Sequence, residues 1–237
     1  FFWPATYGGI TYKELMYDYD KCKQVCFDAV REFEPDAVFP MVMGTAAGRA
    51  LEAIDFKQLQ WPGHGVGDMQ PFQYLDREYM TADEYDDFLF DPTGFYIHKY
   101  LPRVGGAFEG FDKLPVFPGL HYFRLMNGIR PFALPEVRAS FDRIVAAAEE
   151  ANVLFGHHVD WTQRIAAAGF PLINGVNAVS PYDFIADYFR GATGMMKDLY
   201  RHRDKLKLVL EKAAVFLTRM TIANAKAANH PIVFIPI

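Results

Sequence analysis

Two carboxylates and two amides stand close together in the stretch FPLINGVNAVSPYDFIADYFRG, residues 170–191. Its first half is short and apolar and is interrupted by Asn174 and Asn177, which suits a buried parallel strand whose later residues turn toward a site. Asp183 and Asp187 follow four residues apart, so they share one helix face. We expect Asp187 to transfer a proton or stabilise a cation if capping occupies Asp183. Alternatively, the amides only satisfy the backbone of a turn.

The helix that carries these carboxylates has a clear predicted start. The Ser180 hydroxyl can accept from free helical N–H groups, and Pro181 fits the first helical position. In parallel α/β proteins, ligands bind where strands lead into helices. We therefore predict substrate-binding roles for Asn174, Asn177, Tyr182 and Asp183, and catalytic roles for Asp187 and Tyr188.

Three further features of the sequence could carry chemistry. His64, beside Trp61 in a Gly-rich loop, is a candidate acid–base or ligand-orienting residue, or else a solvated loop histidine. Arg103 is a candidate for binding a carboxylate or phosphate, or else forms a structural salt bridge. Cys22 and Cys26 could jointly hold a metal, but both lie on an apolar helical stripe, so buried thiols are the favoured interpretation.

Apolar strands alternate with helices along the chain. We expect parallel strands at 36–43, 170–179 and 232–236. The run 36–44 ends at Gly44. We predict that Gly44 and Met41 lie at the C-terminal end of this strand and bind the substrate. Helices are expected from Asp20 to Pro35, over 45–54, 136–151, 152–168 and 204–228, with a short one that Thr81 and Glu84 begin as a capping box.

Several segments together resemble the uroporphyrinogen decarboxylase superfamily, and more closely its branch of cobalamin-linked methyltransferase relatives. The resemblance covers the chain from about Tyr17 onward and is carried by WPGHG, QPFQYLDREYM, TADEYDDFLFDP, YLPRVGGAFEGFDKLP, GFPLINGVNAVSPYDFIADYFRG and MMKDLYRHRDKL. It implies an α/β fold, a (β/α)8 TIM barrel, with the site at the C-terminal ends of the strands. Members are longer than this chain, so we expect residues 1–237 to be a single domain, the N-terminal portion of such a barrel.

The resemblance implies two reactions. In the methyltransferase branch, a zinc ion activates a substrate thiol, which takes a methyl group from a corrinoid; the zinc ligands of that branch are expected beyond Ile237, and Cys22 and Cys26 do not match them. The alternative is decarboxylation of a tetrapyrrole without a cofactor. That branch carries an Asp where this chain has Met41, its Tyr falls near Asp187 and Tyr188, and its Arg-rich N-terminal loop is not recognisable in FFWPATYGGI. A non-catalytic ligand-binding barrel is the third interpretation.

The composition of the chain limits the classes of ligand and partner that we expect. The net charge of -5 argues against a nucleic-acid surface, and no apolar run is long enough to span a membrane. We expect a small-molecule or tetrapyrrole-like ligand, with a corrinoid protein as the partner for methyl transfer. Two Cys in 237 residues favour a reducing compartment, hence the cytoplasm. Because half a barrel leaves open strand edges, we expect either a longer gene product or a second copy covering the edge in a homodimer.

Overall fold

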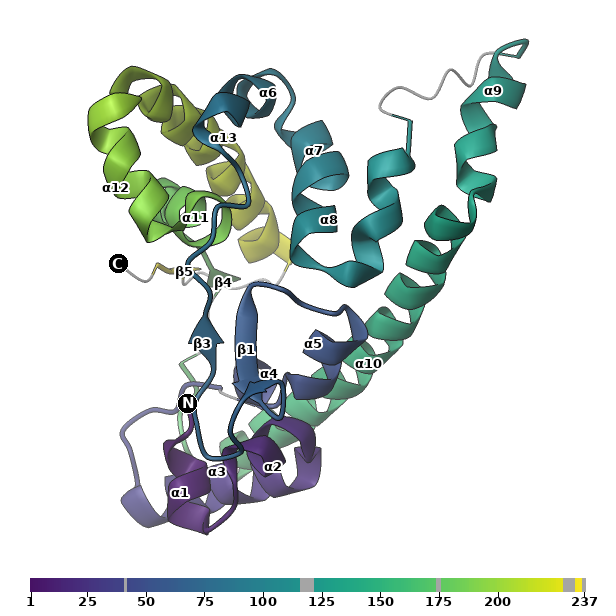
Figure 1. Ribbon diagram of the computed structural model, residues 1–237. Coiled ribbons are helices and arrows are strands. Elements are labelled where there is room, and N and C mark those ends of the chain that lie inside the picture. The colour runs from purple at the N-terminus through teal and green to yellow at the C-terminus, as the bar shows by residue number, and fades with distance from the viewer. Residues whose placement is uncertain (41, 116–121, 174–175, 228–232, 236–237) are drawn as a thin grey trace. The chain divides into compact units, whose positions relative to one another are not determined.

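The structure, a computed structural model, describes residues 1–40, 42–115, 122–173, 176–227 and 233–235 (Figure 1). Helices dominate it and its strands are short. The chain divides into two compact units, described here one at a time. Unit 1 comprises Phe1–Leu75 and Phe141–Asn174, and unit 2 comprises Asp76–Ser140 and Gly175–Ile237. The single-domain expectation stays a prediction.

The expected TIM barrel is wrong. The described residues form only a three-stranded sheet in the order β2-β1-β3 and a two-stranded sheet of β4 and β5. Of the expected strand 36–43, Val38 forms one parallel bridge with Leu172, and Val42–Thr45 is the helix α4. Pro40 and Pro171 have no backbone N–H to donate, so a longer ladder cannot form at those positions.

The other two expected strands are also shorter than predicted. β4 (Val176–Asn177) pairs in parallel with β5 (Val233–Phe234), with Val176 opposite Val233. The rest of 170–179 that the structure describes is irregular apart from the bridge at Leu172. A two-residue strand forms only a few backbone hydrogen bonds with its neighbour. Strands this short cannot close into a barrel.

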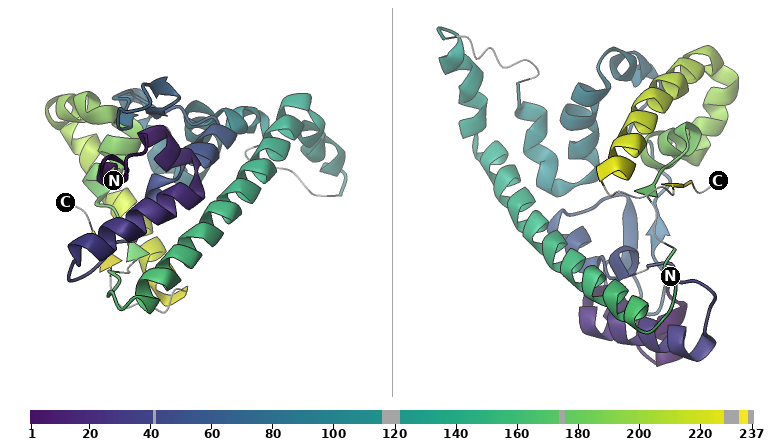
Figure 2. Two further views of the ribbon diagram at one scale, coloured as in Figure 1. Left: turned by 90° about the horizontal axis from the view of Figure 1, so that it is seen from below. Right: turned by 180° about the vertical axis from the view of Figure 1, so that it is seen from behind.

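Unit 1 is built around α3 and the later part of α10, a 33-residue helix. Trp161 of α10 donates its indole N–H to the Lys23 carbonyl at 3.1 Å, and Asp160 pairs with the Lys23 ammonium at 2.7 Å. The two helices therefore lie side by side (Figure 2). The elements of this unit are α1 (Trp3–Gly8), α2 (Tyr12–Tyr17), α3 (Tyr19–Phe33), α4, α5 (Gly48–Ala53), β1 (Leu59–Pro62), β2 (Gly65–Val66), β3 (Gln73–Tyr74) and the part of α10 (Pro135–Ala167) from Phe141 on.

The sequence pattern predicted α3 well and α10 only in part. Asp18, rather than Asp20, caps α3 by accepting from the Lys21 N–H at 3.0 Å, and the expected apolar stripe is buried except at its last residue, Phe33, which is exposed. The predicted helices 136–151 and 152–168 are one continuous helix. The turn expected near Asn152 is absent because buried Leu154 and Trp161 continue the inward face beyond it.

Unit 2 is a helical cluster whose buried aromatic rings surround Phe189. Its ring stacks on Tyr100 at a centroid distance of 4.3 Å and meets Phe88 edge-on at 5.8 Å. The elements of this unit are η1 (Ala82–Glu84), α6 (Tyr85–Phe90), α7 (Pro92–Phe95), η2 (Tyr96–Tyr100), α8 (Leu101–Val104), η3 (Gly106–Lys113), α9 (Leu125–Ile129), η4 (Arg130–Ala133), the start of α10, β4, α11 (Pro181–Ile185), η5 (Ala186–Arg190), α12 (Gly191–Arg201), α13 (Arg203–Ala227) and β5.

Candidate functional site

In unit 2, β4 leads into α11 through a helix cap that the sequence predicted. The Ser180 hydroxyl oxygen accepts from the Asp183 N–H at 3.1 Å and donates to the Asp183 carboxylate at 2.8 Å. Pro181 occupies the first turn. The carboxylate of Asp183 is thus held against the start of the helix, where the helix dipole favours negative charge.

Asp187 lies one turn further, in η5, which is a π-helical turn between α11 and α12. The residue is exposed. Partial desolvation, and then the nearby negative charge of Asp183, raise the pKa of the Asp187 carboxyl above its ordinary value. Short π-helical turns are rare and often occur at functional sites. Asp187 is therefore a carboxyl that holds its proton more tightly than usual while remaining open to a ligand.

The residues around this pair are exposed as well. Asn177 at the end of β4 is exposed, and Tyr182 and Tyr188 show 39% and 40% of their surface. The Tyr188 ring lies 5.7 Å from the Phe184 ring. We call the exposed residues Asn177, Tyr182, Asp187 and Tyr188, together with the half-buried Asp183, the acidic face.

An ion cluster that is buried except at Glu78 fixes the last residue of the same π-helical turn. The Arg190 guanidinium donates to the Asp198 carboxylate at 2.7 Å and to Glu78 at 3.0 Å. The Tyr85 hydroxyl donates to the same Asp198 oxygen at 2.6 Å. Burial, and then this hydrogen bond, raise the pKa of the Tyr85 phenol. We call these four residues the Arg190 cluster; it holds η5, and with it the backbone of Asp187.

His64 lies in unit 1, where it stacks on the Trp61 indole with ring centroids 4.2 Å apart. The Trp61 N–H donates to the Tyr17 hydroxyl at 2.8 Å, and that hydroxyl donates to Glu52 at 2.6 Å. Burial, and then the Glu52 hydrogen bond, raise the pKa of Tyr17 to about 12. Because His64 and the acidic face belong to different units, we do not combine them into one site.

Arg103 forms the structural salt bridge that was one of its two interpretations. Its guanidinium donates to the two Glu84 carboxylate oxygens at 2.8 and 2.7 Å and to the Tyr79 carbonyl at 2.6 Å. These bonds are the first cause of a Glu84 pKa lowered to about 2. The predicted capping box of Thr81 and Glu84 is present, so Glu84 joins the start of η1 to Arg103.

Three further residues were predicted to belong to the site, namely Met41, Gly44 and Asn174. Met41 and Asn174 lie outside the described residues. Gly44 lies in α4, so it ends no strand.

Sequence reasoning missed the Arg190 cluster. Glu78 lies more than a hundred residues before Arg190, and no sequence motif links either of them to Asp198. Only the fold brings the three side chains together. The available signal was a charged residue, Asp198, on the inward face of a helix that also buries Gly194 and Met195.

Within the part of the chain that the structure describes, no three His, Cys, Asp or Glu side chains are grouped so as to hold a metal ion. Among the same residues, no helix has the length and apolar character needed to cross a membrane. No known protein family, curated protein or solved structure matches the chain.

Proposed function

We propose that the acidic face is the substrate-binding and proton-transfer surface of an enzyme, with Asp187 as the group that takes up or releases the proton. The observation that carries this proposal is the position of Asp187, an exposed carboxyl beside a second carboxylate, with a pKa above the ordinary value. A general acid or base works best when its pKa lies near the working pH, so a raised Asp pKa favours this role.

The surrounding residues suit a polar, partly aromatic substrate. The Asn177 amide both donates and accepts hydrogen bonds, and it follows β4 directly. Tyr182 and Tyr188 offer ring faces and hydroxyls beside the carboxyl pair. These groups orient the substrate, and Asp187 exchanges the proton.

The first reaction that we propose is methyl transfer from a corrinoid to a thiol, with a corrinoid protein as partner, because the sequence resemblance implies it. Asp187 accepts the proton that the thiol loses as the sulfur–carbon bond forms, while Asn177 orients the thiol substrate. A bound corrinoid would supply the methyl group, and its bond to that group would break as the sulfur–carbon bond forms, with the electron pair of the broken bond left on the corrinoid. The described residues do not fit a zinc ion, since they include no group of three ligands, and no step is assigned to one.

Decarboxylation of a tetrapyrrole is the second candidate, and the raised Asp187 pKa favours it specifically. Loss of carbon dioxide leaves a carbon that must gain a proton, and a protonated Asp187 can donate it. This reaction requires no cofactor. We propose the cytoplasm as the compartment for either reaction, a proposal that the two free, buried cysteines support.

The test is substitution of the acidic face with both reactions assayed in parallel. Asp187→Asn should lower turnover by about 10²- to 10⁴-fold, the usual contribution of a general acid or base, with the melting temperature nearly unchanged. Asp187→Glu should retain part of the activity. Asn177→Ala should raise KM more than it lowers kcat. The assays are thiol methylation with methylcobalamin and conversion of uroporphyrinogen to coproporphyrinogen.

Asp142→Asn is the matched control, because Asp142 is an exposed helical Asp in the other unit. It should leave both activities unaltered. Unaltered activity per folded molecule in Asp187→Asn would overturn the assigned role. If the protein shows neither activity but binds a tetrapyrrole or corrinoid tightly, then a non-catalytic binding protein is favoured.

A further inference from the structure

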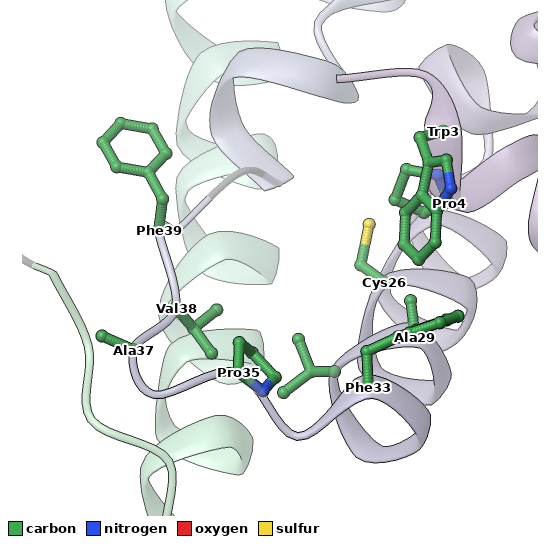
Figure 3. Close-up of a pocket in the computed structure, with 10 residues that line it drawn as sticks. Trp3, Pro4, Cys26, Ala29, Phe33, Pro35, Ala37, Val38 and Phe39 are labelled. Carbon is green, nitrogen blue, oxygen red and sulfur yellow. The ribbon is translucent and has the colours of Figure 1, made fainter.

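Unit 1 contains an apolar cavity of about 240 Å³ next to the end of α3 (Figure 3). Its walls come from α1, from the last turns of α3 and from residues 35–39 that follow. Trp3 and Phe33 meet edge-on at 5.1 Å on one side, and Phe39 stands on another. An apolar cavity of about 150 Å³ is large enough to hold benzene, so this one has room for a small aryl group.

One thiol of a neighbouring pair, that of Cys26, lines this cavity. Figure 3 shows the Cys26 sulfur among the lining side chains and directed toward the space between them. Cys22 lies one helical turn earlier on the same buried stripe of α3, where residues four apart have Cβ atoms about 5–6 Å from one another. Both cysteines are free and almost completely buried.

The two thiols interact with one another. A hydrogen bond from the Cys22 thiol holds the pKa of Cys26 below its ordinary value, and that same bond, followed by burial, raises the pKa of Cys22. The sulfur that faces the cavity is therefore the better nucleophile and ligand of the two.

Two thiols without a third ligand suit a soft centre that needs only two sulfur atoms. The described residues contain no group of three metal ligands, so a tetrahedral ion lacks donors here. A trivalent arsenical with one organic substituent forms two bonds to sulfur and keeps its substituent. We propose that Cys22 and Cys26 form a dithiol site for such soft, thiophilic compounds, with the apolar substituent in the cavity beside Cys26.

The bonding step is balanced without a further reactant. An organoarsenic oxide reacts with the two thiols to form two arsenic–sulfur bonds, and the two thiol protons leave with the oxide oxygen as one water molecule. No atom is oxidised or reduced. The site lies in unit 1, so the inference is independent of the function proposed for unit 2.

The test uses phenylarsine oxide, with arsenite as a matched probe that lacks the aryl group. Native mass spectrometry should show one phenylarsenic bound with loss of two protons per chain, released by a dithiol such as 2,3-dimercaptopropanol but not by glutathione. Cys26→Ser should abolish the adduct, and Cys22→Ser should leave a weak adduct that glutathione removes.

Filling the cavity tests the second part of the site. Ala29 lines the cavity, so Ala29→Leu should weaken phenylarsine oxide binding at least tenfold while arsenite binding stays within about twofold. Circular dichroism confirms that each variant is folded. An adduct that forms only in denaturant, or that persists in folded Cys26→Ser, would overturn the proposal. Equal effects of Ala29→Leu on both probes would overturn the assignment of the cavity to the substituent.

Discussion

Two carboxylates, Asp187 in the π-helical turn η5 and Asp198 in the following helix α12, lie in opposite environments. The buried Asp198 shows 2% of its surface and accepts hydrogen bonds from both Arg190 and Tyr85. Asp187, three residues before Arg190, is exposed, and the charged neighbour that affects its pKa is Asp183. One carboxylate is fully paired, whereas the other lies beside a like charge.

The difference between the two carboxylates separates one that stabilises the fold, Asp198, from one that we propose takes part in the reaction, Asp187. A buried carboxylate that has two donors contributes to folding because removing either side leaves a charge without compensation. An exposed carboxyl next to a like charge adds nothing to folding, and its raised pKa suits proton transfer. This difference is consistent with our proposal that the Arg190 cluster positions the backbone and that the acidic face carries out the chemistry.

The largest expected effect comes from the paired side of this comparison. Asp198→Ala should destabilise the protein by about 3–5 kcal/mol, because it leaves the Arg190 charge buried and partly unpaired. Urea unfolding followed by circular dichroism measures this loss, with Asp142→Ala as the exposed control. A loss below about 1 kcal/mol would remove the distinction between the two carboxylates.

A smaller effect is expected at Glu84, a paired carboxylate that is less buried. Its folded-state pKa of about 2 lies below its ordinary value of 4.5, so its contribution to stability is present above pH 4.5 and is lost as the pH falls toward 2. Glu84→Gln should cost about 1 kcal/mol near neutral pH and flatten the stability profile over that window.

Glu149→Gln is the matched control for Glu84, because Glu149 is an exposed helical Glu. It should leave the profile between pH 2 and 4.5 unchanged. If Glu84→Gln keeps the wild-type slope, then the Arg103–Glu84 pair contributes nothing to acid sensitivity, and pairing alone does not distinguish these carboxylates.

Local signals predicted local structure well in this chain. The Ser180 cap and the capping box of Thr81 and Glu84 are present, and the helix expected over 204–228 is α13 (Arg203–Ala227). Such features depend on side-chain bonds within three or four residues and on an apolar stripe, so a sequence alone can reveal them.

Features that depend on distant partners were not predictable in the same way. The predicted strand lengths were wrong because an apolar run such as 36–43 becomes a strand only where a neighbouring strand offers a full ladder of backbone hydrogen bonds. In this run, Val38 forms a single bridge. The Arg190 cluster joins Glu78 to residues more than a hundred positions away. The acidic face was predicted in sequence because Asp183 and Asp187 are neighbours on one helix, but the raised Asp187 pKa also depends on the burial that the fold provides.

The pKa of Asp187 tests the central claim most directly. Carboxyl-carbon NMR should follow its titration in the wild type and in Asp183→Asn. Asp187 should titrate above its ordinary value of 3.8, and Asp183→Asn should move its pKa downward because the like charge is gone. A wild-type Asp187 that titrates at or below 3.8, or a pKa that Asp183→Asn leaves unmoved, would contradict the account.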